Sequence, residues 1–386
     1  MPTDLTADVL ADRSGAGAIL GQRGRNRRTL RVAFGVTITF LIALWFDWTL
    51  GYLAPAFAAP LLLAPAAPSL STMVRILVMT MLVVLAFYFV AGFARAFPFF
   101  FLLAMWPALF ATLLFMERQG SPLIVLLLLL GLMFQPMVAK ISMELSWNVG
   151  MSSFWNIGVS LVVTQVMFAV FPPLSGQPKP PTKPKVSDAE ARRRAAVMTV
   201  ITGLYTMAYF GFDWTNVHTP IYIAIFIQQI SLAVGLKMTK GIMAANVFAG
   251  LIGWGMYELF VMVPNLFFVA LLTLTVVLLF ARVMTSDSPF APLAGGALNV
   301  LVFLVGSAMI SWGDDQTDKF IDRLGEIGMA AIYAIAALVV LQALFPPKPP
   351  GPLLRTPGRG EKVSANSDPD TRDRPQYVPK GVDSRA

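Results

Sequence analysis

The sequence predicts an all-α, polytopic membrane protein with twelve transmembrane helices in two parallel six-helix repeats. Three observations lead to this prediction: an apolar composition, a one-sided placement of positive charge and an internal duplication. Of the 386 residues, 56% are hydrophobic and only 13% are charged. This leaves too few polar side chains to cover a soluble globule of the same size.

Twelve apolar stretches are long enough to cross a bilayer, which takes roughly 20 mainly apolar residues in a helix. They are 30–46, 52–70, 73–93, 97–116, 122–139, 150–171, 195–212, 220–236, 242–261, 265–282, 291–312 and 327–345.

These spans divide the chain into five parts. The parts are a cytoplasmic N-terminal segment 1–29, a first membrane repeat 30–172, a cytoplasmic linker 173–194, a second membrane repeat 195–346 and a cytoplasmic tail 347–386. The tail has too little apolar surface to fold, and we expect it to be disordered. In the Pro- and Lys-rich linker, Ser187 or Asp188 is suited to cap a short charged helix that leads into the seventh span.

Positive charge collects on one side of the predicted membrane. With the N-terminus inside, all but four of the 29 Lys and Arg residues are cytoplasmic, the exceptions being Arg95, Lys140, Lys319 and Arg323. This asymmetry follows the positive-inside rule and predicts a multi-pass membrane protein with both termini in the cytoplasm. The net charge of +8 then faces anionic lipid headgroups, and we expect a lipid bilayer rather than nucleic acid as the partner.

The sequence lacks the residues that several kinds of catalysis and metal binding require. The chain has no cysteine and one histidine, His218, which excludes disulfides, thiol catalysis and a metal centre built from several histidines. No GxxxxGK[ST] loop is present to bind a nucleotide. An integral-membrane acyltransferase centred on His218 is a third hypothesis, but no nucleophile accompanies Asp213 and His218. We therefore predict no enzyme activity, no cofactor and no metal.

The chain carries an internal repeat. The tetrapeptide FDWT occurs at 46–49 and again at 212–215. The shift that aligns these copies also aligns Arg27 and Arg28 with Arg193 and Arg194, Pro98 with Pro264, Phe101 with Phe267, and Ala104 with Ala270. Since each copy would contain an even number of helices, the two repeats are predicted to have the same orientation in the membrane.

The FDWT copies have two interpretations. In one, Trp48 and Trp214 anchor the chain at the periplasmic interface, while Asp47 and Asp213 act as helix caps. In the other, the two carboxylates line a periplasmic vestibule, with His218 as a titratable partner, and couple export to proton entry. The anchor interpretation is favoured. A carboxylate near the interface costs less free energy than one at mid-membrane depth, so its presence there is weaker evidence for a functional role.

The second span of each half provides further candidates. In the first half this span carries Pro55, Pro60, Pro65 and Pro68, and each proline removes a backbone donor and clashes with the preceding turn. The corresponding span of the second half carries Gln228 and Gln229. Interrupted helices at matching positions of two repeats are typical of a transport site, but prolines that bend a helix and glutamines that bond across helices explain the same pattern.

Three more polar residues are candidates for a substrate path. Asn246 lies beside a stripe of small residues in the ninth span, where close helix packing is the favoured interpretation. Arg75 and Lys240 stand at nearly corresponding cytoplasmic starts of the third span of each half. They could attract an anionic substrate, although the positive-inside rule alone accounts for them.

The half-repeat resembles the membrane unit of the fusaric-acid-resistance-like family, the aromatic acid exporters. The resemblance rests on a basic lead, a first span ending in Trp, a Pro-interrupted second span and the third-span sequence KMTKGIMAANVFAGLIGWG, and it covers roughly 23–345. It implies an inner-membrane exporter of small aromatic or hydrophobic acids that works with a periplasmic adaptor of the membrane-fusion type. The large cytosolic domains typical of the family have no counterpart here.

The leading hypothesis is a secondary, proton-coupled exporter of small organic acids, with a substrate path between its two halves. The alternative is a non-transporting membrane scaffold that anchors a periplasmic adaptor or envelope complex. A homo-oligomer is compatible with either hypothesis.

The one-sided charge predicts where reporter fusions should lie. Fusions placed after Thr49 and after Thr215 should both report the periplasm, because both follow the first span of a repeat with the same orientation. Fusions that report opposite sides of the membrane would contradict the parallel duplication.

Overall fold

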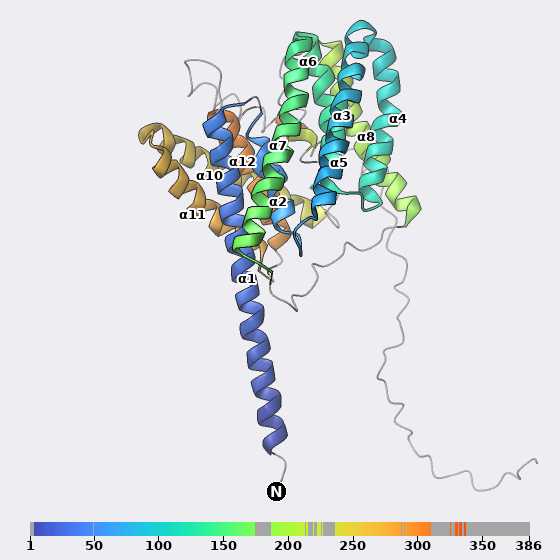
Figure 1. Cartoon of the computed structure of the whole chain (residues 1–386). Coiled ribbons are helices and arrows are strands. Elements are labelled where there is room, and N and C mark those ends of the chain that lie inside the picture. The colour runs from blue at the N-terminus through green and yellow to red at the C-terminus, as the bar shows by residue number, and fades with distance from the viewer. Residues whose placement is uncertain are drawn as a thin grey trace, which may run out of the picture. The chain divides into compact units, whose positions relative to one another are not determined.

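The protein is described by a computed structural model that covers 4–48, 50–173, 187–212, 236–286, 288 and 290–309, with a few single residues between 214 and 226 and between 325 and 336. The side chains of 4–20, 236–240, 243 and 292 are not described. Throughout the described ranges the regular structure is helical (Figure 1).

The helices have the following bounds. They are α1 Asp4–Phe46, α2 Leu53–Leu62, α3 Leu70–Ala96, α4 Pro98–Glu117, α5 Pro122–Leu129, the π-helical turn η1 Leu130–Phe134, α6 Gln135–Ile141, α7 Met143–Val170, α8 Asp188–Gly211, α10 Leu236–Met262, α11 Leu266–Met284 and α12 Ala291–Met309.

Seven helical segments of the described chain are long and apolar enough to cross a membrane. They are Gly21–Phe46, Leu70–Ala96, Pro98–Glu117, Pro122–Ile141, Met143–Val170, Ala244–Met262 and Leu266–Met284. The predicted all-α membrane fold is therefore confirmed, whereas twelve spans and the two-repeat arrangement stay predictions. The predicted eighth and twelfth spans and the disordered tail lie almost wholly outside the described residues.

One predicted span differs from the structure. The predicted second span, 52–70, is helical only over Leu53–Leu62, so it does not cross the membrane as one helix. Inside the predicted linker, 173–194, the helix α8 begins at Asp188. Ser187 caps α8 by accepting the Glu190 N–H, which confirms the predicted cap. The expected short charged helix is simply the first turns of α8.

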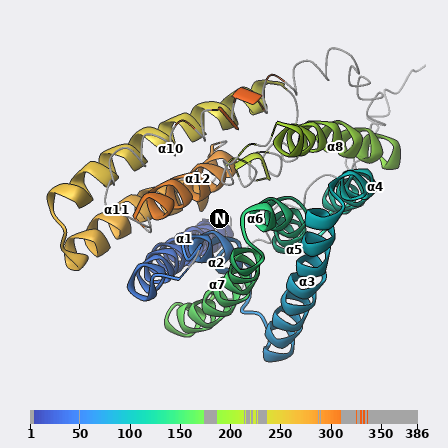
Figure 2. The ribbon, with the colours of Figure 1, turned by 90° about the horizontal axis from the view of Figure 1, so that it is seen from above.

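Helices of the two predicted repeats pack directly on one another. The long α1 contacts α2, α7 and α11, while α2 lies between α7 and α12, and α4 packs along α8 (Figure 2). At the junction of α2 and α12, the rings of Tyr52 and Tyr222 both meet Phe303 edge-on, with centroids 4.8 and 4.7 Å away. All three residues are buried.

The outer faces of several helices carry large apolar side chains. Phe89 on α3, Phe99 on α4, Phe248 on α10 and Phe267 on α11 are each more than 60% exposed. Such a density of exposed aromatic rings is expected where lipid tails, rather than water, surround a helix.

A group of charged residues connects α4 to α8 where the end of α4 meets the start of α8. Arg194 lies 3.9 Å from Glu117 and 3.0 Å from Glu190. Glu190 also accepts two hydrogen bonds from the Arg193 guanidinium, at 2.7 and 2.8 Å. The hydrogen bonds from Arg193, opposed by partial burial and helped by Arg194, together lower the pKa of Glu190 to about 2.

Glu190 should give the protein a pH-dependent part of its stability. Its folded-state pKa lies below the ordinary value of 4.5, so the stabilising free energy is complete above pH 4.5 and is lost as the pH falls toward about 2. Glu190→Gln should remove this part of the pH dependence, measured as the unfolding temperature in detergent between pH 5 and about 2.5. Glu144→Gln, at an exposed position on α7, is the matched control and should keep the wild-type profile. Identical profiles for the two variants would contradict the assignment.

Candidate functional site around the short helix α2

The helix α2 is only 10 residues long and ends inside the packed helices. Eight of its residues are buried, with Pro60 and Leu61 as the exceptions. It ends near Leu62 because Ala64 precedes Pro65, and a residue before proline is driven away from the helical conformation. Pro68 then keeps the chain extended until α3 begins after its Ser69 cap. The interruption predicted from the prolines is therefore present.

A tight turn leads from α1 into α2 and is fixed by the FDWT tryptophan. Asp47 and Leu50 both have positive φ angles, 45° and 57°, which are unfavourable for a branched side chain such as Leu. The Trp48 indole donates to the Asn156 side-chain oxygen at 2.8 Å. The Asn156 amide in turn donates to the Leu50 carbonyl at 2.9 Å. One buried asparagine of α7 thus holds both ends of the strained turn.

The same face of α7 supplies polar groups to the start of α2. The Ser160 hydroxyl lies 2.7 Å from the Ala54 carbonyl, where it can donate, and 2.6 Å from the Asn156 carbonyl. One turn further along, Thr164 donates to the Ser160 carbonyl at 2.6 Å. The Gln165 side chain donates to the Pro68 carbonyl beyond the end of α2. A row of small polar side chains therefore faces the short helix rather than the lipid.

A second irregular helix lies beside α7. The segment α5–η1–α6 contains one π-helical turn directly before Pro136. In a regular α-helix this proline would clash with the carbonyl four residues back, and the wider π turn avoids that contact, with the Gln135 N–H bonded to the Leu130 carbonyl. The carbonyl of Gln135 accepts the Ser146 hydroxyl at 3.1 Å. π turns of this kind are frequent at functional sites.

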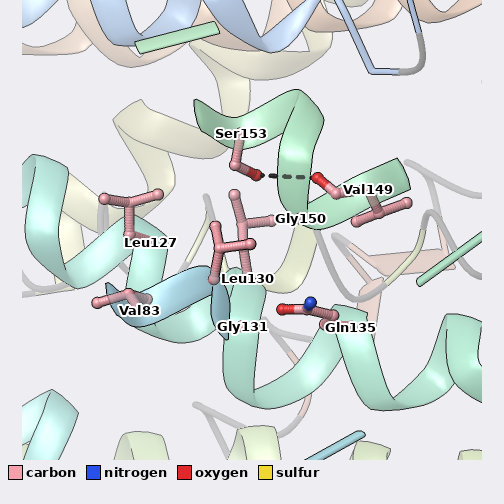
Figure 3. Close-up of a pocket in the computed structure, with 9 residues that line it drawn as sticks. Val83, Leu127, Leu130, Gly131, Gln135, Val149, Gly150 and Ser153 are labelled. Carbon is pink, nitrogen blue, oxygen red and sulfur yellow. Dashed lines mark hydrogen bonds between the residues drawn. The ribbon is translucent and has the colours of Figure 1, made fainter. Parts of the chain in front are cut away.

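A small cavity opens at this π turn. Its volume of about 10 Å³, measured for the centre of a water-sized sphere, has room for one water molecule. Figure 3 shows the Gln135 amide at one wall and the side chains of Val83, Leu127 and Leu130 around the rest. Gln135 is only 3% exposed. Its amide approaches α7 closely because position 150 is glycine, where an added Cβ would lie 2.9 Å from the Gln135 nitrogen.

The candidates of the first FDWT copy have different environments. Trp48 is half-buried and bonded inward, so it is more than an interfacial anchor. Asp47 is exposed and takes no part in capping α2, whose first turn has no side-chain cap. From the second copy, Trp214 is 44% exposed and packs on the rings of Tyr205 and Phe212.

The other candidates are not brought together with this site. Arg75 is exposed in the first turns of α3, and Asn246 is buried in α10. Lys240 belongs to α10, but its side chain is outside the described residues. Also outside them are Asp213, His218, Gln228 and Gln229.

Sequence reasoning missed the polar partners of α2. Asn156, Ser160 and Thr164 recur at four-residue spacing in an otherwise apolar helix, and this spacing places them on one face. Polar residues on one face of a membrane helix indicate a surface turned toward protein. The signal was therefore present, although it does not identify α2 as the partner.

Comparison with known proteins gives one match. A family model described as "Protein of unknown function (DUF2955)" matches residues 28–167, which include α2 and its neighbours on α1 and α7. No curated protein and no solved structure matches the chain.

Replacing the Trp48 indole should loosen the turn before α2. Trp48→Phe keeps an aromatic ring but removes the donor to Asn156, and we expect a loss of about 1 kcal/mol in stability, with more if the Asn156 oxygen stays unpaired. Trp214→Phe is the control in the second copy of the tetrapeptide and should cost less, because among the described residues the Trp214 side chain makes ring contacts alone. Unfolding measured in detergent compares the two, and equal losses would contradict the role of the Trp48–Asn156 bond.

Proposed function

We propose that the protein is a secondary exporter of small aromatic or hydrophobic organic acids in a bacterial inner membrane, driven by the proton gradient. The observation that carries the proposal is the short buried helix α2, held at its start by the polar face of α7. Discontinuous helices whose exposed backbone groups are bonded by neighbouring helices are a recurrent way to build substrate sites in secondary transporters.

Polar side chains inside a membrane cost free energy, so their presence around α2 favours a role beyond anchoring. A chain that only anchors other proteins could cross the membrane with uninterrupted helices, in which every backbone bond is internal. Here three polar side chains of α7, those of Asn156, Ser160 and Gln165, donate to backbone carbonyls in and around α2. Their presence favours transport over the scaffold alternative.

Transport would require the helices around α2 to rearrange. The cavity beside Gln135 has room for one water molecule, far less than an aromatic acid needs. The π turn η1 and the chain after Leu62 lack part of the regular helical bonding, so they are the elements best suited to bend. In this proposal the described arrangement is a closed form.

The energy source follows from the chemistry that the sequence lacks. Without a nucleotide-binding loop, a secondary exporter depends on an ion gradient, and a carboxylate is the usual group to carry a proton through such a protein. Asp47 is exposed at the turn before α2, and Asp213 is its sequence counterpart in the second FDWT copy. We infer that these two residues couple proton entry to export, with a periplasmic adaptor completing the path out of the cell.

Purified protein in liposomes should move benzoate in response to a pH gradient. We expect Asp47→Asn with Asp213→Asn to insert and purify like wild type yet lose the proton-dependent flux, because Asn keeps the shape and the tolerance of positive φ but cannot titrate. Each single variant should retain part of the flux.

Two results would contradict this proposal in different ways. A wild-type protein that moves no benzoate or related aromatic acid under any gradient would favour the scaffold alternative. Normal flux in the double variant would leave export in place but assign coupling to another group.

A further inference from the structure

Two arginines of α1 reach the end of α2. Arg28 donates to the Leu63 carbonyl at 2.6 Å, and Arg31 donates to the carbonyls of Leu62 and Ala64 at 2.9 and 3.1 Å. The guanidinium of Arg31 also lies over the Phe168 ring, 3.8 Å from its centroid. Three carbonyls that the end of α2 leaves without helical partners are thus bonded by two side chains one helical turn apart.

The charge of this pair is not balanced. Neither arginine forms an ion pair with a carboxylate in the described part of the chain. The end of a helix offers only about half a negative charge, against two full positive charges. Arg31 is 2% exposed, and the Nε of Arg28 is buried without an acceptor. Buried positive charge with an unused donor is unfavourable unless an anion completes the site.

The second half of the sequence provides an internal comparison. The alignment of the two FDWT copies places Arg27 and Arg28 on Arg193 and Arg194. In the second half, Glu190 binds both arginines and Glu117 lies 3.9 Å from Arg194. The first half has glycine, Gly24, where the second half has Glu190. Both aligned arginines of the second half are therefore paired with a carboxylate, whereas Arg28 in the first half is bonded to a carbonyl that leaves its charge uncompensated.

We propose that Arg28 and Arg31 form a binding site for an oxyanion, a carboxylate or a phosphate, at the cytoplasmic end of α2. The buried Nε of Arg28 and the guanidinium groups not used by the α2 carbonyls are the donors. Arg28 is half-buried, so the anion approaches from its side. Apolar surface for the body of an amphiphilic ligand comes from Phe168 of α7. It also comes from the stacked rings of Phe34 on α1 and Phe171 at the end of α7, whose centroids are 5.9 Å apart.

Two sources can supply this oxyanion. The phosphate of an anionic phospholipid reaches the cytoplasmic end of the membrane helices from the bilayer. The carboxylate of a small aromatic acid reaches it from the cytoplasm. The inference does not require transport, because it concerns binding at equilibrium, so it can hold even where the exporter proposal fails.

The test compares Arg28→Gln with Arg27→Gln. Both variants remove one positive charge from adjacent positions of α1, but Arg27 is exposed and bonds to nothing in the described chain. Protein in phosphatidylcholine nanodiscs is titrated with benzoate and, as a neutral analogue, with benzyl alcohol. In parallel, native mass spectrometry in neutral detergent counts the phosphatidylglycerol molecules retained by each variant.

We expect Arg28→Gln to lower the affinity for at least one of these anions by about tenfold, because the variant loses a charge-assisted hydrogen bond. Arg27→Gln should bind both anions as wild type does, and the neutral benzyl alcohol should not bind. A loss of benzoate binding identifies a solute site, and a loss of retained phosphatidylglycerol identifies a lipid site.

One further variant keeps the test informative if Arg28→Gln proves unstable. Arg31→Lys retains the positive charge but loses the planar guanidinium, whose several donors can bond two carbonyls and an anion at once. Arg31→Lys should therefore also lower the affinity for the anion. If neither anion binds wild type, or if Arg28→Gln and Arg31→Lys bind both anions as Arg27→Gln does, the arginines only cap α2 and the proposal is wrong.

Discussion

The structure around α2 depends on one constraint: backbone groups inside a membrane must find hydrogen-bond partners within the protein. A helix of 10 residues leaves donors at its start and acceptors at its end without partners of their own. The donors at its start bond to carbonyls of the preceding turn, those of Leu50 and Gly51. The polar face of α7 adds bonds to carbonyls at the start of α2 through Asn156 and Ser160, and the arginines of α1 bond the carbonyls after it. The close packing of α1, α2 and α7 follows from these bonds as much as from apolar contact.

How much of this was predictable depends on the range of each interaction. The membrane class and the interruption of the second span follow from composition and from prolines, which act on their own neighbours in the chain. The partners of α2 do not follow, because Asn156 lies more than a hundred residues away from the Leu50 carbonyl that it binds. Pro136 indicates a distorted helix, but proline alone does not distinguish a kink from a π turn. In this π turn Gly131 packs against the Phe87 ring, with which an added Cβ would clash.

The tryptophans of the two FDWT copies show the limit of local patterns. Trp48 and Trp214 have the same neighbours in sequence, and both were interpreted as interfacial anchors. Within the part of the chain that the structure describes, the Trp48 indole donates to a buried asparagine of another helix, whereas the Trp214 side chain has ring contacts alone. An identical tetrapeptide therefore has a structural role in one copy that its sequence alone does not reveal, because that role is supplied by α7.

The two basic leads differ in a way that bears on function. Glu190 binds both Arg193 and Arg194 and neutralises part of their charge. Arg194 in turn connects α8 to Glu117 on α4. Arg28 and Arg31 bind carbonyls, which satisfy donors without cancelling charge. A carboxylate partner would compete with any incoming anion, whereas a carbonyl partner leaves the electrostatic attraction in place. Among the described residues, an anion that approached the end of the interrupted helix would therefore meet two arginines and no competing carboxylate.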